Sequence, residues 1–321
     1  MNWKLKAAIQ RSCAALPAGQ EAVYYSLQRI FGSLRRPVNP IPMWEEAVSI
    51  VSDLQAAGFD IHGARVMEIG TGRRLDMPIG LFLCGAASIL TVDLHRYLKP
   101  DLALQSLRTL AEHREKLRAL FLRVTGAAEL DERMESLIRA ATFQEFLAAA
   151  RIEYRSPADA AHMDLPDGGI DLQTSYTVFE HIPGPVLAAI LREANRLLSK
   201  GGVACHHIDP SDHFSHEDPA ISAIHFLRYS EAEWDRYAGN QFAYHNRLRT
   251  HQYRRIYEEC GHEILQWKEI VDSRSLAEIR GGFPLHEEFR PLAPEILSTV
   301  VVRAISRPSL LDTDEQRRAA K

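Results

Sequence analysis

The sequence is poor in cysteine and has no long uninterrupted apolar run. Four cysteines occur in 321 residues and none forms a CxxC pair (Cys13, Cys84, Cys205 and Cys260). This spacing argues against a disulfide framework and favours a reduced, cytoplasmic protein. The longest apolar stretch, residues 77–92, contains a proline and two glycines, so it is too short and too broken to span a bilayer. The polar residues Gln10 and Arg11 likewise make the N-terminus a poor secretory signal.

An excess of positive charge is also missing. The chain has 38 Lys and Arg against 42 Asp and Glu, a formal net charge of −4. No nucleic-acid partner is therefore expected. Residues 1–36 are locally basic, which favours either an amphipathic arm packed on the main domain or a surface that approaches an anionic membrane or a phosphorylated substrate. The oligomeric state stays open at this stage.

From residue 64 onward, short strands alternate with helices. A buried strand at 65–69, a helix at 78–85 and a strand at 89–93 form a β-α-β succession, which predicts a parallel sheet with right-handed crossovers. Further strands are predicted at 152–156, 170–175, 203–208, 264–271 and 296–305, and further helices at 43–57, 185–198 and 247–260. We expect an N-terminal helical arm or cap (1–60), an α/β domain (61–305) with a helical insertion at about 100–150 and a second insertion at about 209–246, and a flexible tail (306–321).

A glycine-rich turn follows the first strand. Gly70 and Gly72 permit a sharp turn and close approach of a ligand to the main chain. The dinucleotide fingerprint needs a third glycine where this chain has Leu75, which argues against a nicotinamide-dependent oxidoreductase. Glu68 precedes the turn and Asp93 ends the second strand, where a carboxylate can accept both hydroxyls of a ribose. These acids suit a positively charged nucleoside, for which S-adenosylmethionine is the obvious candidate.

Several segments, taken in order, resemble the motifs of class I S-adenosylmethionine-dependent methyltransferases of the type 11 methyltransferase-domain family. They are residues 66–72, 91–94, 158–160 with 164–171, 178–182 and 196–202. The resemblance implies a Rossmann-like, mostly parallel seven-stranded sheet whose last strand is antiparallel, and S-adenosyl-L-methionine as cofactor. It also implies which residues bind that cofactor: Glu68, Gly70, Thr71 and Gly72 for the methionine part, Asp93 and Leu94 for the ribose side, and Asp159 and Ala160 for the adenine. Tyr176 would face either the methionine part or the acceptor.

The acceptor pocket of such a sheet lies beyond the carboxyl ends of its strands. Residues 206–216, just after the fifth strand, hold four histidines and two aspartates, and histidine can act as a base or a metal ligand at neutral pH. We predict His181, Asp209 and His213 as catalytic residues. The alternative is that these histidines merely hydrogen-bond and solvate an insertion.

Glu180 and His181 together resemble a segment of the ubiquinone-biosynthesis O-methyltransferases, which implies ligands for a divalent metal. The additional glutamate of that family falls at Thr177, so Asp209 or Asp212 would have to supply the missing oxygen ligand for Mg²⁺. The same Glu-His pair also occurs in methyltransferases without a metal, where it is structural. We therefore expect no metal requirement.

Asn246 and Arg247 precede the late helix and suit recognition of sugar hydroxyls, a carboxylate or a phosphate. Residues 226–230 and 246–249 also resemble methyltransferases of glycan and saccharide biosynthesis, although this resemblance is weaker than that of the cofactor motifs. We predict O-methylation of a small-molecule, sugar or glycan-linked acceptor. The alternatives are a quinone-like, lipid or amine acceptor, and a non-catalytic methyltransferase-like binding or scaffold protein.

Overall fold

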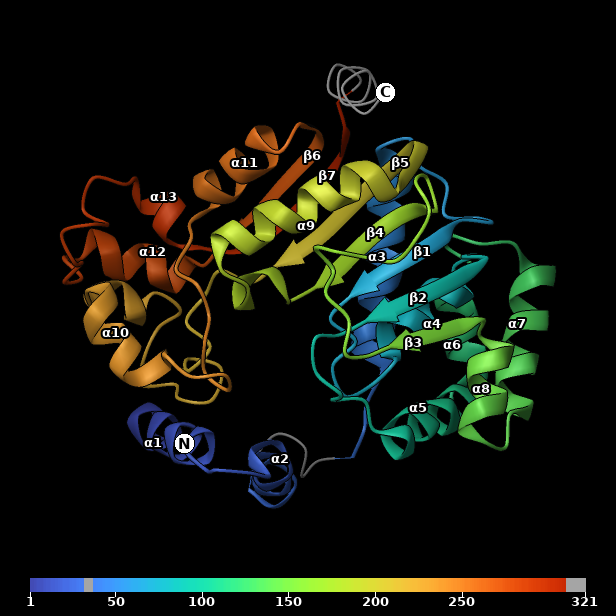
Figure 1. Ribbon diagram of the computed structural model, residues 1–321, viewed down its shortest axis with the longest axis horizontal. Coiled ribbons are helices and arrows are strands. Elements are labelled where there is room, and N and C mark those ends of the chain that lie inside the picture. The colour runs from blue at the N-terminus through green and yellow to red at the C-terminus, as the bar shows by residue number, and fades with distance from the viewer. Residues whose placement is uncertain (32–36, 310–321) are drawn as a thin grey trace.

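Seven strands form a single sheet in the order β3-β2-β1-β4-β5-β7-β6 (Figure 1). The computed structural model describes residues 1–31 and 37–309. The strands are β1 (Arg65–Ile69), β2 (Ser88–Val92), β3 (Ile152–Arg155), β4 (Ile170–Tyr176), β5 (Leu198–Ile208), β6 (His262–Val271) and β7 (Thr299–Pro308). Strands β1 to β5 run parallel to one another, and β7 pairs antiparallel with both β5 and β6. The predicted class I methyltransferase fold is confirmed.

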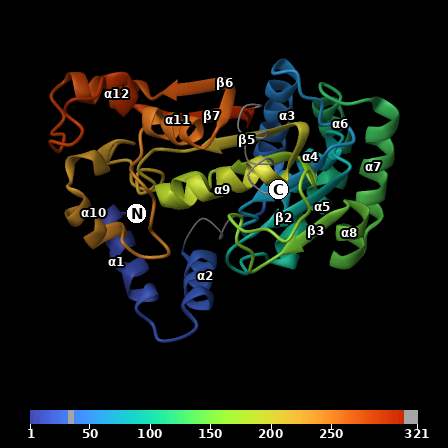
Figure 2. The ribbon, with the colours of Figure 1, turned by 45° about the horizontal axis from the view of Figure 1, so that its top comes forward.

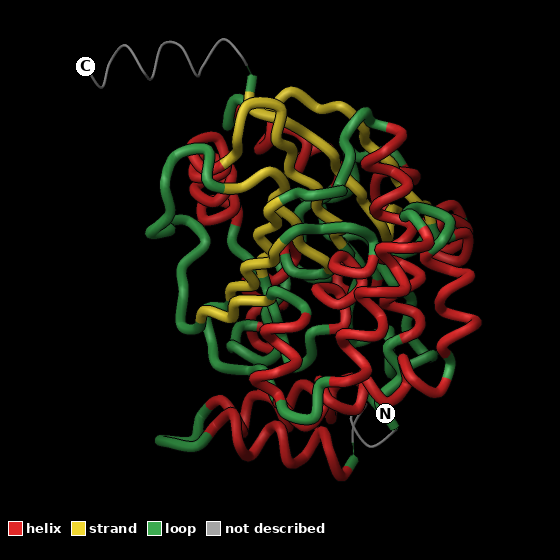
Figure 3. The backbone as a smooth tube through the Cα atoms, turned by 90° about the vertical axis from the view of Figure 1, so that its right-hand side faces the viewer, coloured by secondary structure: helices red, strands yellow, loops and turns green. Residues whose placement is uncertain are grey.

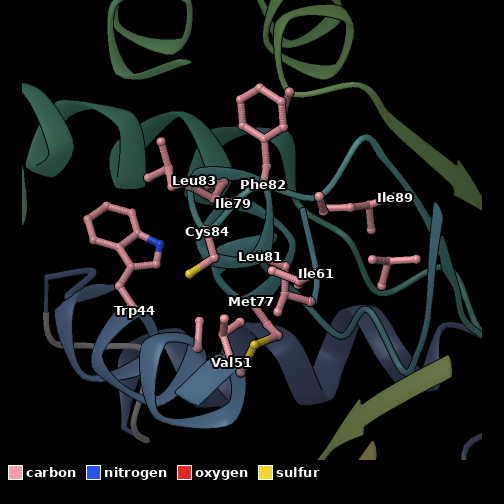
Figure 4. Close-up of a cluster of buried hydrophobic side chains, with 14 of the residues drawn as sticks. Trp44, Val51, Ile61, Met77, Ile79, Leu81, Phe82, Leu83, Cys84 and Ile89 are labelled. Atoms are coloured by element: carbon pink, nitrogen blue, oxygen red, sulfur yellow. The ribbon is translucent and has the colours of Figure 1, made fainter. Parts of the chain in front are cut away.

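Helices cover both faces of this sheet because side chains alternate along buried strands. Val66 joins the core beneath α3 (Ile41–Ala56) and α4 (Asp76–Leu83), whereas Met67 joins the core beneath α9 (Gly184–Leu197) and α11 (Thr250–Glu259). Figure 3 shows the strands as one twisted layer between helices. Figure 4 shows side chains of α3 and α4 packed against each other. A Cβ atom at Gly80 would lie 2.6 Å from that of Ala47, so glycine permits this close approach.

The segment predicted as a helical insertion is helical. It consists of α5 (Pro100–Glu112), α6 (Arg114–Phe121), α7 (Ala127–Arg139) and α8 (Phe143–Ala149), between β2 and β3. Apolar residues of all four helices join the core beneath α3 and α4, among them Leu107, Leu117, Leu137 and Phe146. The insertion therefore enlarges one core layer and does not form a separate domain.

The N-terminal arm packs against the second insertion, although the two are more than 200 residues apart in sequence (Figure 2). The arm consists of α1 (Trp3–Ala14) and α2 (Gln20–Ile30), and the insertion contains the short helices η3 (His225–Arg228) and α10 (Glu231–Ala238). Trp3 lies in a separate apolar cluster with Phe214 and Trp234, and Lys6 pairs with Glu217 at 2.9 Å. One face of the basic arm is thus used within the molecule.

Several elements differ from the prediction. Helix α3 belongs to the main core rather than to an arm, because its Trp44 and Leu54 are fully buried there. Strand β7 begins at Thr299, after a short helix α13 (Pro294–Leu297), and continues into the expected tail as far as Pro308. Helix α12 (Ser273–Arg280) was not predicted. Residues 310–321 of the expected tail and residues 32–36 of the arm lie outside the described residues. Among the described residues, no helix is long and apolar enough to span a membrane.

Candidate functional site

A cavity of about 1070 Å³ opens at the carboxyl ends of β1, β2 and β4. Its wall contains all nine residues predicted to bind the cofactor: Glu68, Gly70, Thr71, Gly72, Asp93, Leu94, Asp159, Ala160 and Tyr176. The volume exceeds the roughly 300–1,000 Å³ usual for a single small ligand. There is room for a cofactor and an acceptor together.

The turn after β1 is shaped by backbone that only glycine adopts readily. Gly70 has φ of 87°, and a Cβ atom there would lie 2.4 Å from Cγ2 of Val178, so any other residue would meet both strain and a clash. Gly72 has φ of 63°, and its N–H donates to Oδ2 of Asp93 at 2.9 Å. The carboxylate that ends β2 therefore also fixes the turn that follows β1.

The two arginines after this turn pair with acids. Arg73 contacts Glu21 of α2 at 2.7 Å, and Arg74 contacts Asp76 at 3.0 Å. Both arginines line the cavity, but their charges are already compensated. They shape the wall and offer little excess positive charge to an anionic acceptor.

Glu68 forms the buried inner end of the cavity. Its side chain is 4% exposed, and its Oε2 accepts a hydrogen bond of 2.5 Å from Thr91. Burial raises the pKa of Glu68 to about 8, because a carboxylate loses hydration there and gains no cation. A bound group with a positive charge would supply the missing partner.

This environment predicts a pH-dependent affinity for adenosylmethionine. Below about pH 8 the empty site holds a proton on Glu68, and a cationic ammonium group beside it must displace that proton. Affinity should therefore rise with pH by up to roughly tenfold per unit below 8, and binding at pH 7 should release a proton. Calorimetric titration in buffers of different ionisation enthalpy measures both effects.

Glu68→Gln is the matched variant, because the ligand's own titration cancels in the comparison with the wild type. It should bind more weakly at pH 9 and lack the additional pH dependence. Equal pH profiles in the two proteins would remove Glu68 from contact with the ammonium group.

The nucleoside side of the cavity combines an exposed apolar side chain with two acids. Leu94 is 60% exposed, which costs free energy unless a ligand covers it. Asp159 accepts a hydrogen bond from the N–H of Ala161 at 2.9 Å. The pKa of Asp159 is lowered by this bond and by His162. Together with Asp93 these residues fit the adenine and ribose of an adenosyl group.

His181 is the predicted catalytic residue that reaches the cavity. It belongs to the 3₁₀ helix η2 (Phe179–His181) after β4 and lines the cavity wall. Its Nδ1–H donates to the carbonyl oxygen of Tyr244 at 2.9 Å, which leaves Nε2 with its lone pair. Burial lowers the pKa of His181, so the ring is neutral at pH 7 and this nitrogen can engage a proton or a cation.

Asp209 and His213 are close to His181 but do not line the cavity. The rings of His181 and His213 are 4.8 Å apart between centroids, and Nε2 of His213 lies 3.7 Å from Oδ2 of Asp209. Glu180 is fully buried, with Oε1 4.0 Å from the same nitrogen. The three predicted catalytic residues therefore come together, and His181 is the one through which the group reaches the cavity.

The prediction that Asn246 and Arg247 bind the acceptor is not supported by the geometry, because neither residue lines the cavity. Asn246 donates to the carbonyl oxygens of Phe179 and Ile182 and accepts from Tyr253. Its amide is fully used in holding the η2 turn. Arg247 donates to the carbonyl oxygen of Tyr229 at 2.6 Å.

Other polar residues of the 206–216 segment point elsewhere. His206 stacks on Phe179 on one side of the sheet, and His207 lies 3.3 Å from Glu46 of α3 on the other. Asp212, the alternative metal ligand, is buried beside His225 at 3.2 Å. Asp212 is thus excluded from the group around His181, whereas Asp209 is part of it.

The sequence did not reveal that α2 and the 235–244 segment line the cavity. Tyr24 of α2 stacks on Phe242 at 4.4 Å between ring centroids, and both line the cavity with Asn240 and Gln241. No motif marks these residues. Their only signal was the aromatic and amide content of the second insertion.

Comparisons with known proteins found one family model and several solved structures that resemble the chain. Residues 111–206 match the model of a methyltransferase domain family. Three solved structures are similar in fold: magnesium protoporphyrin IX methyltransferase from Synechocystis PCC 6803 (14% identity, 95% of this chain and 99% of that one, TM-score 0.45), and S-adenosylmethionine-dependent methyltransferases from Mesorhizobium loti (16%, 80% and 96%, 0.41) and Methanosarcina mazei (12%, 78% and 94%, 0.43). No curated protein sequence matches the chain.

Proposed function

We propose that this chain, a class I S-adenosylmethionine-dependent methyltransferase, methylates a hydroxyl group of a small acceptor such as a sugar or a glycan-linked saccharide. The observation that carries the proposal is the single cavity that joins the cofactor strand ends to His181. Because the methyl donor and a neutral imidazole face the same space, an acceptor bound between them meets both.

The acceptor end suits a hydroxylated ring. The cavity wall contains, besides the predicted cofactor residues, the aromatic rings of Tyr24 and Phe242 and the amides of Asn240 and Gln241, and we assign these four residues to the acceptor. Aromatic rings can pack on the apolar face of an uncharged polar ring, and amide groups can hydrogen-bond to the hydroxyls at its edge. The described wall includes no lysine, and its two arginines are paired with acids, which disfavours an acceptor that depends on a phosphate.

Bound adenosylmethionine supplies a methyl group on a sulfonium, which departs as a neutral thioether. The protein's own part is alignment and exclusion of water. Glu68 and Asp93 fix the two ends of the donor, and α2 covers the cavity through the Glu21–Arg73 pair. The proton of the acceptor hydroxyl must leave as the new C–O bond forms, and His181 stands where that proton is released.

The direct test supplies methyl-labelled adenosylmethionine with simple sugars, glycosides, quinols, lipids and amines. We expect labelled methyl ethers from saccharide hydroxyls, together with release of adenosylhomocysteine. Label found only on amines, quinols or lipids would replace the saccharide assignment. Tight binding of adenosylhomocysteine with no transfer to any class would favour the non-catalytic binding protein.

His181→Ala should lower kcat by about 10²-fold or more, the usual range for a group that assists proton transfer. Binding of adenosylhomocysteine should change little, because His181 is not among the residues assigned to the cofactor and its ring hydrogen-bonds to the carbonyl oxygen of Tyr244. His251→Ala, an exposed histidine on α11, is the matched control and should retain full activity. Normal kcat in His181→Ala would remove this residue from the reaction.

The four cysteines are all free and buried, which supports a reducing compartment such as the cytoplasm. Proximity of the N-terminal arm to a membrane remains a separate prediction. Vesicle sedimentation with anionic lipids would test it, and failure to bind would leave the arm with its intramolecular role alone.

A further inference from the structure

Glu180 is a fully buried carboxylate without a partner. Its exposed fraction is 0%, and neither Oε1 nor Oε2 makes a hydrogen bond within the part of the chain that the structure describes. An uncompensated carboxylate in such a place costs several kcal/mol unless it is protonated or meets a cation. In the empty site burial raises the pKa of Glu180 well above its usual value, and its ionised form would need a cation that the described residues do not provide.

Open nitrogen ligands surround the same space. Nε2 of His213 is buried and also lacks a hydrogen-bond partner among the described residues. One ligand atom each from Glu180, His181 and His213 lie within 4.8 Å of one another. Asp209 adds a second carboxylate, 3.7 Å from Nε2 of His213. Ligand atoms of a divalent ion with bonds of about 2.0–2.2 Å are roughly 3–4 Å apart, so small rotations of these side chains would close the set.

The charges in this group also fall short of balance. Among residues 1–31 and 37–309, the ion pairs of Glu180 and Asp209 are made only with histidines. Neither carboxylate pairs with a lysine or an arginine there. A divalent cation would compensate both carboxylates at once.

We propose that Glu180, His181 and His213, completed by Asp209, bind one divalent transition-metal ion beside the acceptor end of the cavity. Two imidazoles and two carboxylates favour Zn²⁺, Mn²⁺, Fe²⁺ or Co²⁺ over Mg²⁺ and Ca²⁺, which prefer oxygen ligands. The ion is thus of a different class from the Mg²⁺ considered from the Glu180-His181 pair alone.

The surroundings hold the ligands in the orientation that an ion needs. The Nδ1–H of His181 donates to the carbonyl oxygen of Tyr244 at 2.9 Å, which leaves Nε2 as the ligand atom, the arrangement typical of metal-bound imidazoles. The ring of His213 stacks between those of His216 and His245, each 5.0 Å away. Because these contacts are made by the protein itself, the site is largely formed before an ion enters.

The role of the ion, although not its binding, rests on the proposed function. His181 connects the ligand group with the cavity. An ion there lies next to the acceptor hydroxyl, and a divalent cation lowers the pKa of a hydroxyl that it polarises. When the ion is bound, Nε2 of His181 is its ligand and does not itself accept the proton; the polarised hydroxyl passes its proton to solvent water as the methyl group is transferred.

The test is titration of the chelator-treated, full-length protein with Co²⁺ and Zn²⁺, followed by calorimetry, the visible spectrum of Co²⁺ and thermal unfolding. We expect one equivalent to bind, a raised Tm, and no competition from equimolar Mg²⁺. Neither the methyl donor nor an acceptor is present, so this result is independent of the proposed acceptor. Absence of binding by the folded wild-type protein would overturn the proposal.

Variants identify the ligands. Glu180→Gln and His181→Gln should each weaken Co²⁺ binding by at least about 100-fold. The His181→Gln variant is less at risk of misfolding, because the His181 side chain lines the cavity. His251→Gln is the matched control, since His251 is an exposed histidine of α11 outside the ligand group. It should bind as the wild type does. Unchanged binding in His181→Gln, or equal loss in His251→Gln, would refute this ligand set.

Discussion

Asp93→Ala is expected to weaken binding of adenosylmethionine and adenosylhomocysteine by at least about 100-fold. In the structure Oδ2 of Asp93 accepts from the N–H of Gly72 at 2.9 Å, and Oδ1 accepts from that of His95 at 3.0 Å. Asp93 also lines the cavity, so its remaining lone pairs are available to the ribose hydroxyls of a bound cofactor. Hydrogen bonds to a charged group contribute about 1.5–3 kcal/mol each, and loss of two to ribose hydroxyls alone corresponds to roughly 100-fold or more.

The same substitution also frees the Gly72 turn, so the loss should exceed that of a pure ribose contact. Asp93→Asn keeps an acceptor for Gly72 and should fall between the wild type and alanine. Asp159→Ala is the control on the same nucleoside side, where the carboxylate is 54% exposed, and should cost only a few-fold. Calorimetry with adenosylhomocysteine measures all three, and wild-type affinity in Asp93→Ala would contradict its assignment to the ribose.

The cofactor half of the site could be predicted from the sequence because its geometry is local. Glu68, Gly70 and Gly72 are consecutive along one strand end and its turn, and Asp93 ends the neighbouring strand in the register that a parallel pair imposes. Strand ends that meet at one edge of a parallel sheet bring such residues together without further information. The sheet order then follows from the βαβ rules and from the family resemblance.

The acceptor half depends on contacts between distant segments, which sequence patterns do not encode. Tyr24 reaches the cavity only because α1 is anchored by Trp3 in the cluster with Phe214 and Trp234. Asn246 has a side chain suited to sugars, but the backbone of the η2 turn uses its amide completely. An asparagine is suited to bind sugar hydroxyls, but Asn246 does not line the cavity.

Arg303→Met is expected to lower the free energy of unfolding by about 3 kcal/mol. Arg303 of β7 is 8% exposed and pairs with Asp53 and Glu46 of α3, and it donates to Oγ of Ser49 at 3.0 Å. Removing one partner of a buried ion pair strands the other charge, which costs roughly 3–5 kcal/mol. The low end applies here because the Glu46 side chain is 24% exposed. Urea unfolding followed by circular dichroism measures the change.

The pH dependence of this difference separates the ion pairs from simple packing. Burial alone would raise the pKa of Asp53, but hydrogen bonds from Lys268 and Arg303 outweigh burial and lower it. Burial would likewise raise the pKa of Glu46, but a hydrogen bond from His207 and the positive charge of Arg303 lower it. Carboxylates with lowered pKa stabilise the fold above their ordinary values near 4, and that stability is lost as the pH falls through the lowered values. The difference in free energy of unfolding between the wild type and Arg303→Met should therefore shrink below about pH 4.

The control is Arg307→Met. Arg307 is in the same strand, but its side chain is 46% exposed in its pair with Glu263, so this variant should change stability by no more than about 0.5 kcal/mol. A gap for Arg303→Met that stayed constant with pH would assign its effect to lost packing of the arginine stem against α3 and not to the charges.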